Sequence, residues 1–185
     1  MNNTHKDKKT SVKDRSQENV SGLSEMDDSV EVYMQLLQET SSTERSLMSV
    51  LPGLTEGCTS VDFRELLYRF KDQIAGQADR LEEMLDDLGD HDSGIACLSF
   101  ELLTAQIIDI LDDHRGGRVE DAQLLTWLRR AIHFQIASYR SLLLNAEKLT
   151  SEKYRRFLQL TLSEKQEFDT ELELIETQNA DSKIS

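Results

Sequence analysis

Residues 119–149, VEDAQLLTWLRRAIHFQIASYRSLLLNAEKL, decide the fold because one face of this stretch is apolar at helical spacing. The face repeats at alternating steps of three and four residues and consists of Leu125, Leu128, Ile132, Gln135, Tyr139, Leu142, Ala146 and Leu149. Such spacing is typical of a helix that buries one stripe inside a bundle. The polar member of the stripe, Gln135, lies near its middle.

Three other stretches of the chain carry a similar stripe, and each is also interrupted near its middle by a polar residue. The interruptions are Glu44 in the stripe of residues 33–54, Gln77 in that of residues 63–88, and Glu164 in that of residues 154–175. Capping residues and turn clusters divide the chain into helices predicted at 29–57, 60–89, 98–113, 119–149 and 151–177. Four long helices and one short helix in a long crossover predict an all-α four-helix bundle.

The composition supports a helical protein and excludes several functions. The 185 residues include 21 Lys and Arg against 35 Asp and Glu, a formal charge of −14, with eight glycines and one proline. Few glycines and prolines argue against an all-β fold, which needs many turns. The acidic balance argues against nucleic-acid binding, which needs a concentrated positive face. No apolar run is long enough for a membrane span or a signal peptide, so we expect a cytoplasmic protein that does not bind membranes.

The domain organisation follows from where the apolar residues begin and end. Residues 1–28 are polar and predict a disordered tail, residues 29–178 form the bundle, and residues 179–185 are expected to fray. The tail is basic at its start, so it is a solvated linker, a segment that folds back on the acidic body, or a contact for a protein partner. Pro52 predicts a kink or a break in the first helix.

The four interrupting residues, Glu44, Gln77, Gln135 and Glu164, are the candidate site. At matched depths in a bundle they would share one layer, and buried carboxylates are costly unless they are paired, hydrogen-bonded or bound to metal. An amide can donate to a carboxylate, so the layer can close by hydrogen bonds. Alternatively the stripes are displaced by one residue, and Glu44 or Glu164 faces solvent.

Motifs for other chemistry are missing from the sequence. It contains no glycine-rich phosphate loop and no Gly-x-Ser-x-Gly elbow. Cys58 and Cys97 are too few for a zinc motif, and we interpret both as small buried hydrophobic residues. His133 lies beside the central stripe, where a structural role is favoured over metal ligation. No catalytic residue is therefore predicted.

Several short pieces of the chain, in this order and spacing, resemble the YciE/YciF family of ferritin-like stress proteins. The pieces are TERSLMSVLP at 43–52, GQADRLE at 76–82, Cys97 with the helix after it, HFQIASY at 133–139 and TLSEK at 161–165. The resemblance spans residues 31–177. It implies a ferritin-like four-helix bundle, usually dimeric, with a rubrerythrin-like dinuclear metal site in its core.

The same resemblance implies that this metal site has lost ligands. Glu44 and Glu164 match positions of the family's carboxylates, whereas Gln77 stands where many members have histidine and Gln135 where they have glutamate. A di-iron centre needs about four carboxylates, so we expect no cofactor, or iron or manganese if the site still works. The expected function is that of a non-catalytic, homodimeric structural or interaction protein. The alternative is a di-iron-type oxidase, peroxidase or iron-handling protein with an unusual ligand set.

Overall fold

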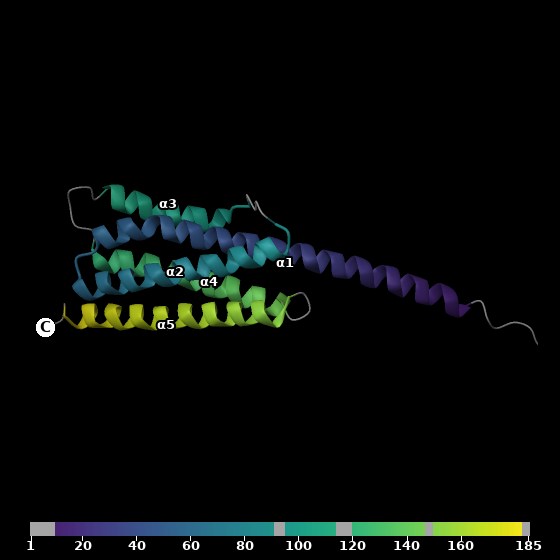
Figure 1. The fold of residues 1–185 in the computed structure, drawn as a ribbon. Helices are drawn as coiled ribbons and strands as arrows, with labels where there is room; N and C mark the ends of the chain where they lie inside the picture. The colour runs from purple at the N-terminus through teal and green to yellow at the C-terminus, as the bar shows by residue number, and fades with distance from the viewer. Residues whose placement is uncertain (1–9, 91–94, 114–119, 147–149, 183–185) are drawn as a thin grey trace, which may run out of the picture.

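The described part of the chain folds into five helices, as the stripes, capping residues and turn clusters predict. The computed structural model describes residues 10–90, 95–113, 120–146 and 150–182, and of residues 10–28 and 180–182 it describes the helical backbone alone. The helices in these ranges are α1 (Thr10–Gly57), α2 (Val61–Asp87), α3 (Leu98–Asp113), α4 (Asp121–Ala146) and α5 (Glu152–Ser182) (Figure 1). The four long helices form the bundle and α3 lies in the crossover between α2 and α4, so the predicted architecture is confirmed.

The helices of the bundle are arranged in the order α1, α2, α5, α4 around its axis. Each of them packs against two neighbours, whereas the diagonal pairs α1 with α5 and α2 with α4 have no close backbone approach in the described ranges. The short helix α3 packs on the outside of α1 and also contacts α4 (Figure 1). A side chain that joins α1 to α5 must therefore cross the centre of the bundle.

The boundaries of α2 and α4 have local causes. The side chain of Ser60 caps α2 by accepting a hydrogen bond from the backbone N–H of Phe63, and Gly89 follows the helix with φ of 80°, a conformation that favours glycine. The Asp121 carboxylate at the start of α4 accepts hydrogen bonds from the backbone N–H groups of Thr59 and Ser60, both at 2.7 Å. This contact holds the α1–α2 turn against α4.

Helix α1 ends at Gly57 as predicted, but it differs from the prediction at Pro52 and at its start. Of the kink or break predicted at Pro52, the break does not occur, because α1 continues to Gly57. Pro52 faces solvent about one and a half turns from the helix end, and the buried Leu51 and Leu54 hold the helix on either side of it. The helix also begins at Thr10 rather than Ser29, since a polar segment without proline can continue a helix although it has no core to bury. The side chains of residues 10–28, and residues 1–9 altogether, lie outside the described residues.

The end of α5 also differs from its predicted position. The helix reaches Ser182 rather than ending near Thr177. The expected fraying of residues 179–185 falls mostly outside the described side chains, and residues 183–185 lie outside the described residues.

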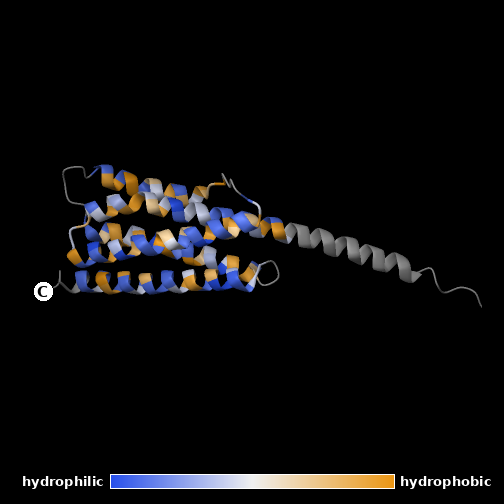
Figure 2. Ribbon diagram, viewed as in Figure 1, coloured by the Kyte–Doolittle hydropathy of each residue, from blue (hydrophilic) through white to orange (hydrophobic). Residues whose placement is uncertain are grey.

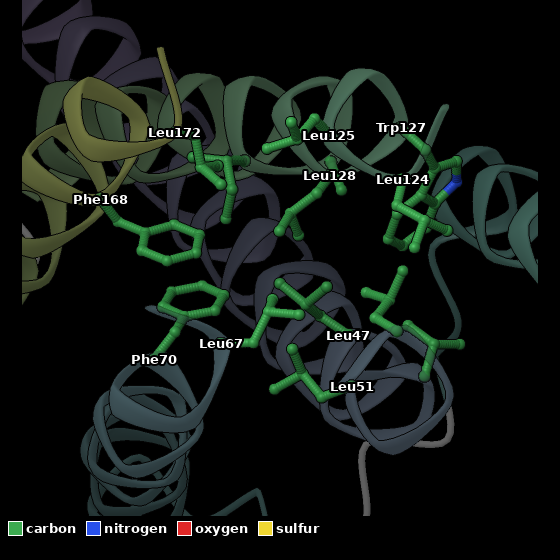
Figure 3. Close-up of a cluster of buried hydrophobic side chains, with 14 of the residues drawn as sticks. Leu47, Leu51, Leu67, Phe70, Leu124, Leu125, Trp127, Leu128, Phe168 and Leu172 are labelled. Atoms are coloured by element: carbon green, nitrogen blue, oxygen red, sulfur yellow. The ribbon is translucent and has the colours of Figure 1, made fainter. Parts of the chain in front are cut away.

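The core is built from the predicted stripes. Figure 2 shows that hydrophilic and hydrophobic residues alternate along each long helix, as expected of amphipathic helices. Phe70 of α2 and Phe168 of α5 stack with ring centroids 3.5 Å apart (Figure 3).

Both cysteines are buried, as predicted. Leu88, the last residue of the predicted stripe 63–88, is 42 % exposed, because it lies just past the last turn of α2. None of the described helices is long and apolar enough to cross a membrane.

Candidate functional site

Glu44 and Gln135 meet in the interior of the bundle. Both side chains are fully buried, Glu44 on α1 and Gln135 on the neighbouring α4. The Gln135 amide donates to Glu44 Oε2 at 3.1 Å, and the Tyr139 hydroxyl donates to Glu44 Oε1 at 2.8 Å. The carboxylate thus receives a hydrogen bond on each oxygen from α4, as buried polar groups require.

The third member of this cluster is Lys165 of α5, which is also fully buried. Its ammonium donates to Glu44 Oε2 at 2.8 Å and to Gln135 Oε1 at 2.7 Å. The Nζ atom also lies 5.2 Å from the centroid of the Phe70 ring on α2. Because α1 and α5 are diagonal, the extended lysine side chain places a positive charge where all four long helices meet.

A second cluster lies on the seam between α2 and α5. The guanidinium of Arg80 forms a bidentate pair with Glu164, with two N–H···O distances of 2.8 Å, and also donates to the Thr161 hydroxyl. The Gln77 amide donates to the same Glu164 carboxylate at 2.9 Å. Gln77 is buried, whereas the side chains of Arg80 and Glu164 are about one-fifth exposed. The carboxylate on this seam therefore has a cation of its own.

The structure places the four predicted residues in two pairs. Each glutamine donates to one glutamate, Gln135 to Glu44 and Gln77 to Glu164. Glu164, however, lies at the edge of the bundle, and Lys165 occupies the central position one residue later. Sequence reasoning missed Lys165 and Arg80. The signal for Lys165 was the alternative stripe Tyr154, Leu158, Thr161, Lys165, Phe168 and Leu172, all of whose members are buried.

The titration of these groups reflects their burial. Burial lowers the pKa of Lys165 below its usual value, and the charge of Glu44 opposes that shift. Burial and the adjacent Glu44 charge raise the pKa of Tyr139 well above its usual value, so its hydroxyl stays protonated and can donate. Burial acts to raise the pKa of Glu164, but hydrogen bonds from Arg80 and Gln77 outweigh burial and lower it.

The donor set of the two clusters does not fit a dinuclear metal centre. Such a centre needs about four carboxylates to neutralise two divalent cations. The clusters hold two carboxylates, and each of them is already paired with a protein cation. In the described part of the chain, no three His, Cys, Asp or Glu side chains are grouped closely enough to hold a metal ion.

Comparison with known proteins identifies the family. A family model described as a domain of unknown function, DUF892, matches residues 28–185. The chain belongs to the DUF892 family. The chain is 24 % identical to Escherichia coli protein YciF over 154 residues, which span 83 % of this chain and 93 % of YciF. This similarity confirms the resemblance to the YciE/YciF proteins.

Solved structures support the fold of this DUF892 member. The crystal structure of the E. coli stress protein YciF aligns with a TM-score of 0.72 at 23 % identity, covering 82 % of this chain and 96 % of YciF. The Rhodopseudomonas palustris protein YcfI, for which a structural role is proposed, aligns with a TM-score of 0.68 at 25 % identity, covering 77 % and 90 % of the two chains. The chain therefore has the ferritin-like helical fold of YciF.

The lowered pKa of Glu164 makes the stability of this DUF892 protein sensitive to acid. A carboxyl whose folded pKa lies below its unfolded value of 4.5 stabilises the fold fully above pH 4.5, and that contribution is lost as pH falls through the folded pKa. We expect Glu164→Gln to flatten the loss of stability below pH 4.5, measured by urea unfolding across the acid range. The control is Glu171→Gln, because Glu171 pairs with Arg69 across the same two helices but is exposed. Equal acid slopes for wild type and Glu164→Gln would contradict this assignment.

Proposed function

We propose that this chain is a non-catalytic member of the YciE/YciF proteins, with a structural or interaction role, in which a protein ion-pair network has replaced the dinuclear metal site. The observation that carries the proposal is the fully buried Lys165 ammonium, 2.8 Å from Glu44 and 2.7 Å from Gln135. A lysine ammonium supplies one positive charge and three donors, so it can satisfy a carboxylate that a metal ion would otherwise neutralise.

Charge balance supports this interpretation. The central cluster pairs one carboxylate with one ammonium, and the seam cluster pairs one carboxylate with one guanidinium. Both clusters are neutral as they stand, and a divalent cation added beside Lys165 would be repelled by the ammonium. The amides of Gln77 and Gln135 carry no charge and are weaker ligands than the carboxylates of di-iron bundles.

Metal content tests the proposal directly. We expect purified protein, expressed with added iron and manganese, to hold far less than one iron, manganese or zinc ion per chain by elemental analysis. We also expect its melting temperature to be unchanged by a chelator, because folding does not depend on a metal. About two tightly held ions per chain would support the alternative of a metal-dependent oxidase, peroxidase or iron-handling protein.

The resemblance also suggests how and where the protein works. We propose a cytoplasmic homodimer with a stress-associated role like that named for E. coli YciF, and a basic N-terminal segment that contacts a protein partner. Light scattering after size-exclusion chromatography is expected to give twice the chain mass of 21.2 kDa. A mass of one chain at micromolar concentration would contradict the homodimer.

A further inference from the structure

The outer face of α4 carries arginines that differ in their pairing. Arg129 contacts Asp169 at 3.1 Å and Glu176 at 2.6 Å on α5. Arg130 and Arg140, by contrast, make no ion pair with any residue that the structure describes. In a chain of net charge −14, these two guanidinium groups remain available for an anion from outside.

Arg130 borders a surface hollow of about 310 Å³ between α3 and α4. This α3–α4 hollow is lined mainly by Gln106, Ile110, Gln123, Thr126, Trp127 and Arg130. The described lining contains one cation and no carboxylate. The side-chain amides of Gln106 and Gln123 make no hydrogen bond within the described part of the chain, so two amides and one guanidinium line the hollow unpaired.

The floor of the α3–α4 hollow is apolar. Trp127 is 2 % exposed and belongs to the core cluster in Figure 3. Its indole N–H donates to the backbone carbonyl of Leu103 on α3 at 2.6 Å, which fixes the ring between the two helices. The half-buried Ile110 lines the hollow beside it. The hollow thus combines an apolar floor, formed by Ile110 and an edge of Trp127, with a polar rim that carries one positive charge.

We propose that the α3–α4 hollow binds a small carboxylate with a flat apolar body. The carboxylate pairs with the Arg130 guanidinium and accepts from the Gln123 or Gln106 amide, while the apolar body lies over Ile110 and the edge of Trp127. Guanidinium and carboxylate match in bidentate geometry, and the volume lies at the lower end of the range of about 300–1,000 Å³ for small-molecule sites. This binding activity is independent of the proposed role of the buried ion pairs.

Trp127 provides a specific readout because it is the single tryptophan of the chain. The ¹⁵N-labelled full-length protein therefore gives one indole N–H cross-peak, which we would follow while titrating benzoate or its neutral analogue benzamide. We expect a saturable shift with benzoate and at least about tenfold weaker binding of benzamide, because a charge-assisted pair contributes about 1.5–3 kcal/mol.

Two matched variants separate this site from general attraction to α4. Arg130→Gln is expected to weaken benzoate binding at least about tenfold, whereas Arg140→Gln, about 15 Å along the same helix, leaves it unchanged. The proposal would be overturned if benzamide bound as tightly as benzoate, or if benzoate caused no shift of the indole cross-peak. It would also be overturned if Arg130→Gln bound benzoate fully, or if both variants lost the same affinity. An equal shift with inorganic phosphate would also overturn it, because phosphate lacks the apolar body.

Discussion

Replacing Lys165 with methionine is expected to lower the free energy of unfolding by about 3–5 kcal/mol, the cost of leaving one partner of a buried ion pair uncompensated. Methionine fills much of the lysine volume, so the loss reports the charge rather than a cavity. The variant leaves the Glu44 carboxylate in the interior with hydrogen bonds from Gln135 and Tyr139 but no cation. Urea unfolding at neutral pH measures the change.

The double variant Lys165→Met with Glu44→Gln is the control. Removing both charges leaves no unpaired ion, and neutral replacements of buried pairs are often close to neutral for stability. We therefore expect the double variant to regain most of the stability that Lys165→Met loses. A single variant within about 1 kcal/mol of wild type would show that the pair does not hold a buried charge.

Replacing Phe70 with alanine is expected to cost about 3–5 kcal/mol, as is usual when a buried aromatic ring is truncated. Phe70 is fully buried, and its ring stacks on Phe168 with an interplanar angle of 7°. The ring also faces the Lys165 ammonium at 5.2 Å, a cation–π contact worth about 2 kcal/mol when desolvated. The same unfolding experiment measures the loss.

Phe63→Ala serves as the matched control for Phe70. Phe63 is equally buried on the same helix but has no cation over its ring among the described contacts. We expect the losses in free energy of unfolding from Phe63→Ala and Lys165→Met to add in the double variant. The losses from Phe70→Ala and Lys165→Met are expected to depart from additivity by about 1 kcal/mol. Additive losses for both pairs would show that the aromatic contact does not support Lys165.

Local signals were sufficient for much of the fold. The bounds of α3 match the predicted 98–113, and the start of α2 follows the predicted cap at Ser60. Helical periodicity and capping act over a few residues, so a single sequence displays them directly. The predicted helix 29–57 also spans Pro52, but local signals left a kink or a break open there, because the continuity of α1 depends on packing around Leu51 and Leu54.

The candidate site shows where prediction from one sequence stopped. Glu44 and Gln135 were placed in the interior and are found there, hydrogen-bonded to each other. Glu164 and Lys165 are adjacent charged residues, and a stripe with steps of three and four can pass through either of them. The periodicity of the sequence alone does not show which of the two residues faces the core. Arg80 was not predicted, because in a sequence an arginine on the flank of a helix looks the same whether it is solvated or, as here, mostly buried in an ion pair.

The sequence by itself determined that the chain is an acidic all-α bundle, that four helices carry a polar residue in the apolar stripe, and that the chain resembles the YciE/YciF proteins. Only the tertiary structure decided which cation enters the core. Glu44 and Lys165 lie 121 residues apart, on helices that face each other across the bundle diagonal. Their pairing depends on how the four helices are rotated about their axes, which is set by packing between helices and not by the periodicity of any one of them.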